Sequence, residues 1–426
     1  MFERNRRVVE AAKSLLIILL SLSALYLAGR AILYDKGGES GVFTGEESYF
    51  LSATEPMGNA GVSRPVRMAV VNADGRYAVQ YDTAGVDELF DGLGDLLGEA
   101  LDSAAAAAPV GRESWEQALL SRGVYYDFPG SVPLSLVSAW LGEGETVLSA
   151  QISALVLAAE DGSELVRLYY VDADTGLYYA CDTAAQFRQR LDGYIPNGAL
   201  FAFQRPERYD GVDQDTLILP NVPAPAIYEG KAAVNLEDSA VLDALLNVLS
   251  FDPQPNAIYP AADGWNVRDG EDSLRLTAAG TIYYHGAEGS DRYHISDTAS
   301  RAEMVEATGE LVRQAMTPYT EEGRVYLSEA VENGESWTLT YFYTLSGAEV
   351  QLGQEGWCAH FTIQNGQIRE YVLKLRRYEK TEQTAVLLPE YQAMHAMQAM
   401  DAEGRQLLLR YYDGGAGMVA PTWIAR

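Results

Sequence analysis

Cysteine and histidine are scarce in this sequence. Among its 426 residues there are only two cysteines, Cys181 and Cys358, which is too few for a disulfide framework. The two positions lie far apart in the chain, so a single bridge between them stays open but is not favoured. The four histidines show neither H-x-x-x-H nor H-E-x-x-H spacing, which argues against a zinc site of the usual kind. They are His285, His294, His360 and His395.

Positive charge is also scarce. The chain has 31 basic and 60 acidic side chains, and its formal net charge is -29. Such a surface repels nucleic-acid phosphates and anionic lipid headgroups, so we expect no nucleic-acid partner. Solubility alone explains most of this acidity.

The common catalytic motifs are missing as well. The sequence has no G-x-S-x-G elbow and no G-x-x-x-x-G-K-[ST] loop. Cys358 and His360 share one face of a predicted strand, where ordinary strand residues are a better interpretation than a nucleophile pair. Asp172–Gly176 resembles the start of a calcium loop but lacks the later acidic ligand, which favours a hairpin turn. A solvated loop is the simplest interpretation of a second acidic cluster, formed by Asp210, Asp213 and Asp215.

The sequence therefore predicts a protein that is not an enzyme and that needs no metal or cofactor. One alternative stays open, because a pair of carboxylates for glycoside hydrolysis has no sequence signature among so many acidic residues. We rank a hydrolase of envelope glycans lowest among the functions considered.

One long hydrophobic run is present, near the N-terminus. A basic tail at 1–13 precedes an apolar segment at 14–34, which is long enough for the roughly 20 residues that a membrane-spanning helix needs. Basic residues stay on the cytoplasmic side of a membrane, so residues 35–426 are expected outside the cell. A cleaved signal peptide is the rival interpretation, but the run is long for one and no convincing cleavage site follows it.

One face of the predicted membrane helix carries mostly small side chains. They recur at spacings of three and four, and they are Ser14, Ile17, Ser21, Ala24, Ala28 and Ala31. Small residues let two helices approach closely in lipid, so this seam is a candidate surface for pairing with a partner's membrane helix. The simpler interpretation is that serine and alanine only fill a moderately apolar helix.

The outer region has an α+β pattern, in which antiparallel sheets carry helices packed on one face. We predict a linker at 35–48, an N-terminal domain at 49–205, a central domain at 206–318 and a C-terminal domain at 319–426. In the first domain we expect strands at 66–71, 76–81, 124–129, 151–159, 165–171 and 177–181. The helices expected there lie at 89–108, 113–122, 133–141 and 184–191.

The later domains repeat this mixture of elements. In the central domain we expect helices at 238–251 and 298–316, with strands at 265–269, 273–277 and 281–285. In the C-terminal domain we expect a meander of strands at 324–331, 336–343, 348–352, 357–364 and 367–378. A helix at 388–400 and a last strand at 407–412 complete the pattern.

Several stretches resemble the YycH family. They are Tyr125–Leu134, Leu245–Pro253 and Ser273–Tyr284. In the C-terminal domain, Ala359–Ile363 and Leu388–Ala393 resemble the related YycI family. The resemblance spans nearly the whole chain but is diffuse, and it includes no chemical motif whose residues can be carried over.

This resemblance implies a single-pass regulator of the cell-wall sensor histidine kinase of Gram-positive bacteria. It would act through association of membrane helices and of extracytoplasmic domains, with a YycI-type sister protein as a further partner. The alternative is an extracytoplasmic binding module for peptides or cell-wall fragments, which would use an exposed sheet edge.

Overall fold

A computed structural model describes residues 64–425, except for 73, 142–145, 160–163, 188–190, 192, 220–223, 254–256, 400–406 and 416. The chain divides into two units, Met1–Ser48 and Tyr49–Arg426, and every described residue belongs to the second. The predicted tail, membrane helix and linker therefore lie outside the described residues. Within the described residues, no helix combines the length and apolar character that crossing a membrane requires.

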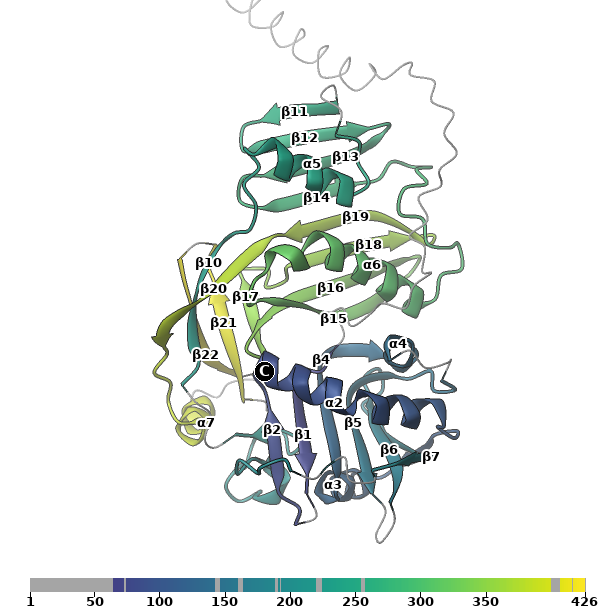
Figure 1. The fold of residues 1–426 in the computed structure, drawn as a ribbon, viewed down its shortest axis with the longest axis vertical. Coiled ribbons are helices and arrows are strands. Elements are labelled where there is room, and N and C mark those ends of the chain that lie inside the picture. Colours follow the sequence, from purple (N-terminus) through teal and green to yellow (C-terminus); the bar gives the residue numbers. More distant parts are fainter. Residues whose placement is uncertain are drawn as a thin grey trace, which may run out of the picture. The chain divides into compact units, whose positions relative to one another are not determined.

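The N-terminal part is built on a sheet of seven described strands in the order β2-β1-β4-β5-β6-β7-β3 (Figure 1). All its neighbouring strands pair antiparallel. The strands are β1 (Arg67–Val71), β2 (Tyr77–Gln80), β3 (Ala108–Val110), β4 (Gly123–Pro133), β5 (Gln151–Ala159), β6 (Leu165–Asp172) and β7 (Tyr178–Gln186). The helices of this part are α2 (Thr83–Asp102), α3 (Arg112–Leu120) and α4 (Leu134–Trp140).

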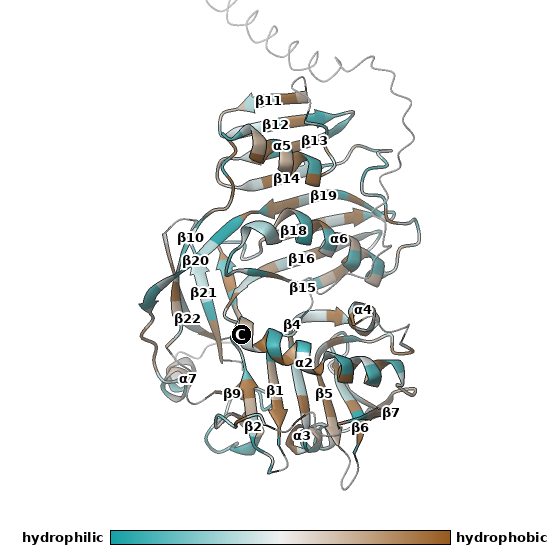
Figure 2. Cartoon of the chain, viewed as in Figure 1, coloured by the Kyte–Doolittle hydropathy of each residue, from teal (hydrophilic) through white to brown (hydrophobic). Residues whose placement is uncertain are grey.

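Helices cover both faces of this sheet, so the prediction of helices on one face is wrong here. In β1, Met68 and Val70 pack in the cluster that includes the leucines of α2. Ala69 and Val71 point the other way and pack with Trp115 of α3. Figure 2 shows hydrophobic residues along β1. Because successive side chains of a strand alternate between faces, a continuous apolar strand needs cover on both sides.

Two other predictions for this part are wrong. The helix expected to reach Ala108 ends at Asp102, and Ala108–Val110 pairs with β7 instead. The helix expected at 184–191 is strand as far as Gln186, which pairs with Leu165 of β6. In both places the hydrogen bonds of the sheet edge override the helix propensity of alanine.

A second sheet contains thirteen described strands (Figure 1). Its order is β11-β12-β13-β14-β19-β18-β16-β17-β21-β22-β10-β20, and β15 pairs with β16. Strands of the predicted central and C-terminal domains share this sheet, since β14 pairs with β19 and β10 with β20 and β22. Most pairs are antiparallel, as predicted, but β17 and β21 run parallel.

The first strands of this sheet are β10 (Ala226–Ala232), β11 (Ile258–Ala261), β12 (Gly264–Asp269), β13 (Asp272–Thr277) and β14 (Thr281–His285). Those that follow are β15 (Arg324–Asn333), β16 (Ser336–Leu345), β17 (Ala348–Leu352), β18 (Ala359–Gln364), β19 (Gln367–Lys374), β20 (Arg376–Thr384), β21 (Leu407–Asp413) and β22 (Gly417–Ala425). A separate short pair consists of β8 (Leu200–Phe201) and β9 (Leu217–Ile218). The helices are α5 (Ser239–Val248), α6 (Arg301–Ala315) and α7 (Glu390–Ala399).

The strand expected at 367–378 is two strands, β19 and β20, which pair with different partners. The chain changes direction near Arg376, whose guanidinium donates to both carboxylate oxygens of Asp413 at 2.8 and 3.0 Å. Tyr378 donates to the same carboxylate at 2.9 Å, and all three side chains are buried. A buried ion pair needs this degree of hydrogen bonding, because removing one partner would leave an uncompensated charge.

The two sheets meet where β4 lies against β15. A Cβ atom at Gly130 would come within 2.2 Å of the carbonyl oxygen of Ser328, so only glycine allows this approach. An ion pair crosses the same junction, between Asp87 and Arg324. Asp87 of α2 accepts at 2.9 Å from Arg64 and at 2.9 Å from Arg324 of β15.

The close contact between β4 and β15 predicts that a small substitution at Gly130 destabilises the protein. Gly130→Ala should lower the free energy of unfolding by about 1–3 kcal/mol, because the added methyl meets backbone that has to move. The control is Gly92→Ala in α2, where the nearest atom to an added Cβ is the Tyr194 hydroxyl, 3.8 Å away. That variant should gain about 0.5–1 kcal/mol. Urea unfolding of both variants measures the difference, and equal stabilities would contradict the proposed close contact.

Candidate functional site

A pocket of about 630 Å³ lies next to the junction of the two sheets. This volume lies in the range of small-molecule sites. Its lining comes from distant parts of the chain. They are the start of β1, the Asp127–Pro129 stretch of β4, β9 with residue 219, β15–β17, the 384–390 segment and the β21–β22 hairpin. Sheet pairing and the junction together bring these segments to one place.

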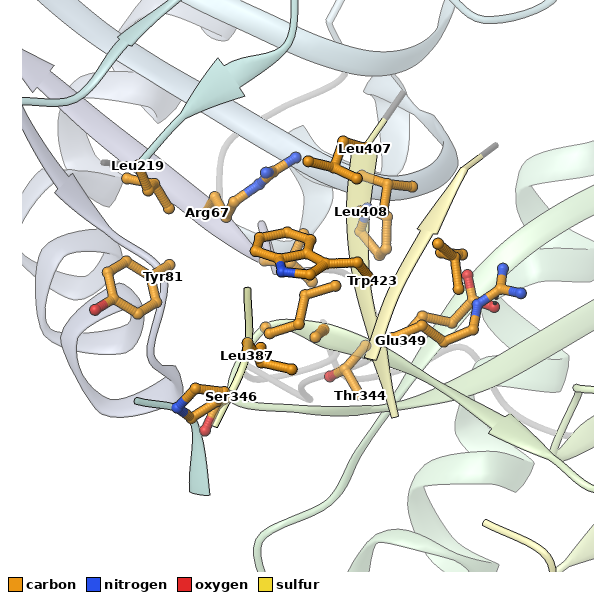
Figure 3. Close-up of a pocket in the computed structure, with 18 of the residues that line it drawn as sticks. Arg67, Tyr81, Leu219, Thr344, Ser346, Glu349, Leu387, Leu407, Leu408 and Trp423 are labelled. Carbon is orange, nitrogen blue, oxygen red and sulfur yellow. Dashed lines mark ion pairs between the residues drawn. The ribbon is translucent and has the colours of Figure 1, made fainter. Parts of the chain in front are cut away.

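Apolar side chains form most of the wall. Figure 3 shows Trp423 in the middle of the group, with Leu387 on one side and Leu407 and Leu408 on the other. The Trp423 indole nitrogen donates to the carbonyl oxygen of Leu388 at 2.9 Å, which ties β22 to the segment before α7. Further apolar side chains in the wall are Leu217, Leu219, Phe342 and Ile424.

The wall continues to an exposed rim. The segment between β20 and α7 is Ala385–Pro389, and the side chain of Val386 is 99% exposed. Leu388 is 52% exposed. Apolar side chains at the mouth of a pocket give a bound molecule apolar contact beyond the pocket itself.

Two ion pairs occupy the charged part of the wall. Arg67 of β1 donates through Nε to Asp127 at 2.6 Å, and its guanidinium enters the group drawn in Figure 3. Arg410 of β21 pairs with Glu349 of β17 at 3.0 Å, across the parallel strands. Each guanidinium is therefore matched by one carboxylate within the wall.

Glu390, the first residue of α7, is the third carboxylate of the wall. The backbone of Leu219 donates a hydrogen bond to it, but its Oε2 is buried and has no hydrogen-bond partner among the described residues. Burial raises the pKa of Glu390 from 4.5 to about 7, although the Leu219 hydrogen bond and the charges of Arg67 and Arg208 oppose the rise. A buried carboxylate without a full set of partners is costly unless it is protonated.

The other chemical groups singled out in the sequence lie elsewhere. Cys181 and Cys358 are both free and buried, so they do not form a bridge. Burial raises the pKa of the Cys358 thiol well above its ordinary value and lowers the pKa of His360, so this pair does not offer a reactive thiolate. No group of three potential metal ligands occurs within the part of the chain that the structure describes.

The acidic stretches are structural. Asp172 accepts backbone hydrogen bonds from Asp174 and Thr175, as expected for a turn between β6 and β7. Asp215 is not simply solvated as predicted. It accepts from Arg112 at 2.9 Å and from the Tyr178 hydroxyl at 2.8 Å. The seam of small residues at 14–31 lies outside the described residues and stays a prediction.

Sequence reasoning missed the pocket altogether. Leu388 and Pro389 were recognised as the start of a helix, and Tyr125–Leu134 as a segment resembling YycH. Nothing in the spacing of Arg67, Asp127 and Glu390 indicates that they share a cavity. Only the long-range strand pairing brings them together.

Comparison with solved structures identifies the fold. The structure of YycH from Bacillus subtilis is similar with a TM-score of 0.51, covering 85% of this chain and 93% of the YycH chain, at 10% sequence identity. The chain has a YycH-like fold. At this identity the likeness concerns the fold and carries no site residues with it. No protein-family model matches the sequence, and neither does any curated protein.

The raised pKa of Glu390 predicts a pH-dependent stability difference. The folded state favours the neutral carboxyl, so its stabilising contribution is full below pH 4.5 and is lost as the pH rises through about 7. Glu390→Gln stays neutral, so it should exceed the wild type by about 2 kcal/mol at pH 8 and match it near pH 4.5. This difference counts about 1.4 kcal/mol for each unit by which the pKa is raised, and it is reduced because the carboxyl is partly exposed to solvent.

Urea unfolding of the full chain across this pH range measures the difference. Glu382→Gln, an exposed residue of β20 that does not line the pocket, is the matched control and should show no pH-dependent difference. A Glu390→Gln variant with the same advantage at both ends of the range would contradict the assignment.

Proposed function

We propose that this protein is a membrane-anchored extracytoplasmic regulator of a cell-wall-sensing histidine kinase. The observation that carries the proposal is the YycH-like fold, which extends over 85% of the chain. The apolar run at 14–34, with basic residues before it, supports an anchor whose C-terminal side faces the envelope.

The proposed mechanism is a population shift. A sensor kinase has at least two packings of its membrane helices, and a partner that contacts one packing better than the other shifts the balance between them. In this chain the contact would come from the seam of small residues, and the outer domains would add a second contact. A YycI-type sister protein is a further proposed partner for the outer domains.

The seam can be tested directly. Ala24→Leu with Ala28→Leu should reduce co-association with the kinase in membranes at least about tenfold, because large side chains hold the two helices apart. Ser23→Leu is also a small-to-large change, but it lies off the seam and should have little effect. The measurement is crosslinking of the full chain to an epitope-tagged sensor kinase in cells, together with output from a kinase-controlled promoter. Unchanged crosslinking in the double variant would contradict the role of the seam.

The pocket favours a second candidate function, that of an extracytoplasmic binding module for peptides or cell-wall fragments. A half-buried cavity with apolar walls and a few convergent polar groups is the common form of a ligand site. The two functions are compatible, since a ligand could act on a regulator.

Removing the anchor distinguishes the kinase-regulator function from the binding-module function. A chain that begins at Tyr49, the first residue of the second compact unit, should lose regulatory activity in cells if the membrane helix is the docking surface. If the protein is a binding module, the same fragment keeps its affinity for the ligand and its effect on promoter output. Promoter output in cells that export the fragment is the measurement. Full activity of the free fragment would argue against regulation through the membrane helix.

A further inference from the structure

The charges of the pocket are not balanced. Among the described residues that line it, three carry a carboxylate, Asp127, Glu349 and Glu390, and two carry a guanidinium group. Arg67 is hydrogen bonded to Asp127 and Arg410 is paired with Glu349. Glu390 is left with a buried oxygen that accepts no hydrogen bond from any described group. The described wall therefore carries one negative charge in excess when Glu390 is ionised, although the Arg208 guanidinium outside the wall also acts on this charge.

The charged surroundings of Glu390 come from several elements. Arg67 lies on β1 and Arg208 in the loop between β8 and β9, and both charges act on this carboxyl. Arg67 is already hydrogen bonded to Asp127. The Arg208 guanidinium lies over the Tyr209 ring, 5.7 Å from the centre of that ring. The other charged groups of the wall are the Asp127 carboxylate and the paired Glu349 and Arg410.

This arrangement discriminates between ligand charges. Both guanidinium groups of the wall are already paired with carboxylates, so they would attract an anionic ligand only weakly. The carboxylate of Glu390 would repel such a ligand. A neutral apolar ligand would fill the wall but leave the ionised Glu390 carboxylate without a positive partner, and an uncompensated charge in a partly buried site is costly. A ligand with an ammonium group supplies both a donor and the missing positive charge.

We propose that this pocket binds a small amphiphilic amine, with an apolar alkyl or aryl body against Trp423 and Leu387 and a primary ammonium group on Glu390. The proposal rests on the ligand-binding role of this pocket in the second candidate function, but it names a small amphiphile in place of a peptide or cell-wall fragment. It does not depend on the kinase. The body would lie between the β21–β22 hairpin and the segment before α7. The exposed Val386 and Leu388 extend the apolar contact at the rim.

The affinity of the pocket for the amine should depend on pH. An alkylammonium stays charged throughout the neutral range, so the ionisation of Glu390 governs the attraction. With a pKa of about 7, this carboxyl is mostly neutral at pH 6 and mostly ionised at pH 8. Binding of the amine should therefore strengthen by about tenfold between these pH values.

Photoaffinity labelling of the full chain in lipid nanodiscs tests the proposal. The probes are three diazirine-bearing hexyl chains that end in an amine, an alcohol or a carboxylate. Labelled peptides are identified by mass spectrometry and quantified at pH 6 and pH 8. The amine should label peptides that contain Leu387 or Trp423 more strongly than the other two probes, and only the amine should gain about tenfold with pH.

Glu390→Gln should reduce amine labelling about tenfold at pH 8 and remove its pH dependence. Labelling by the alcohol probe should persist in this variant, which shows that the pocket is still folded. Glu382→Gln, with the same chemical change on the exposed part of β20, should behave as the wild type.

Two outcomes would overturn the proposal in different ways. Equal labelling of the pocket by all three probes would reject selectivity for amines while leaving the binding-module function standing. Failure of every probe to label pocket peptides, in a chain that unfolds cooperatively, would reject the pocket as a site for amphiphilic ligands while leaving the kinase-regulator function standing.

Discussion

The backbone of β4 rests directly on the backbone of β15, and the pocket depends on this contact. Gly130 makes it feasible, since a Cβ atom there would lie 2.2 Å from the Ser328 carbonyl oxygen. Asp87 holds Arg64 and Arg324 together across the same junction. Farther along, Arg301 of α6 donates to Asp174 at 2.8 Å, between strands of the first sheet and a helix on the second. Apolar packing within each sheet would not by itself fix how the two sheets meet.

Next to this junction, the low dielectric disfavours the charged form of a buried acidic side chain. Most of the 60 acidic side chains give the surface its charge and its solubility. Glu390 differs because burial removes water from part of its carboxyl. Its pKa therefore rises to about 7, where a change in pH or a nearby cation alters its state. The Arg67–Asp127 and Arg410–Glu349 pairs leave it as the unmatched charge of the wall.

Local patterns in the sequence were sufficient for most helices and strands. The helix expected at 238–251 begins at its cap Asp238, whose side chain accepts from the Ala240 backbone at 3.0 Å. Asn365 and Gly366 separate two of the expected strands, and both residues adopt the positive φ that a tight hairpin turn requires. The α+β class followed from these elements, and the resemblance to YycH agrees with the fold observed.

Long-range pairing was not predictable in the same way. Ala104–Ala108 has the composition of a helix, but Ala108 pairs with Ala180 of β7. The strand β22 was missed because Gly417–Ala425 includes Pro421 and three residues with little strand character, yet it pairs with β21 and β10. The pocket combines segments from residue 66 to residue 424, so its charge balance exists only after folding.

The most direct test of this account is the titration of Glu390 itself. Carbon-13 NMR of the labelled side-chain carboxyl should give a pKa near 7 in the free protein, compared with 4.5 for an ordinary glutamate. Saturating hexylamine should lower this pKa, because the bound ammonium favours the ionised form, whereas hexanol should not. A carboxyl that titrates near 4.5 and does not respond to the amine would contradict the account.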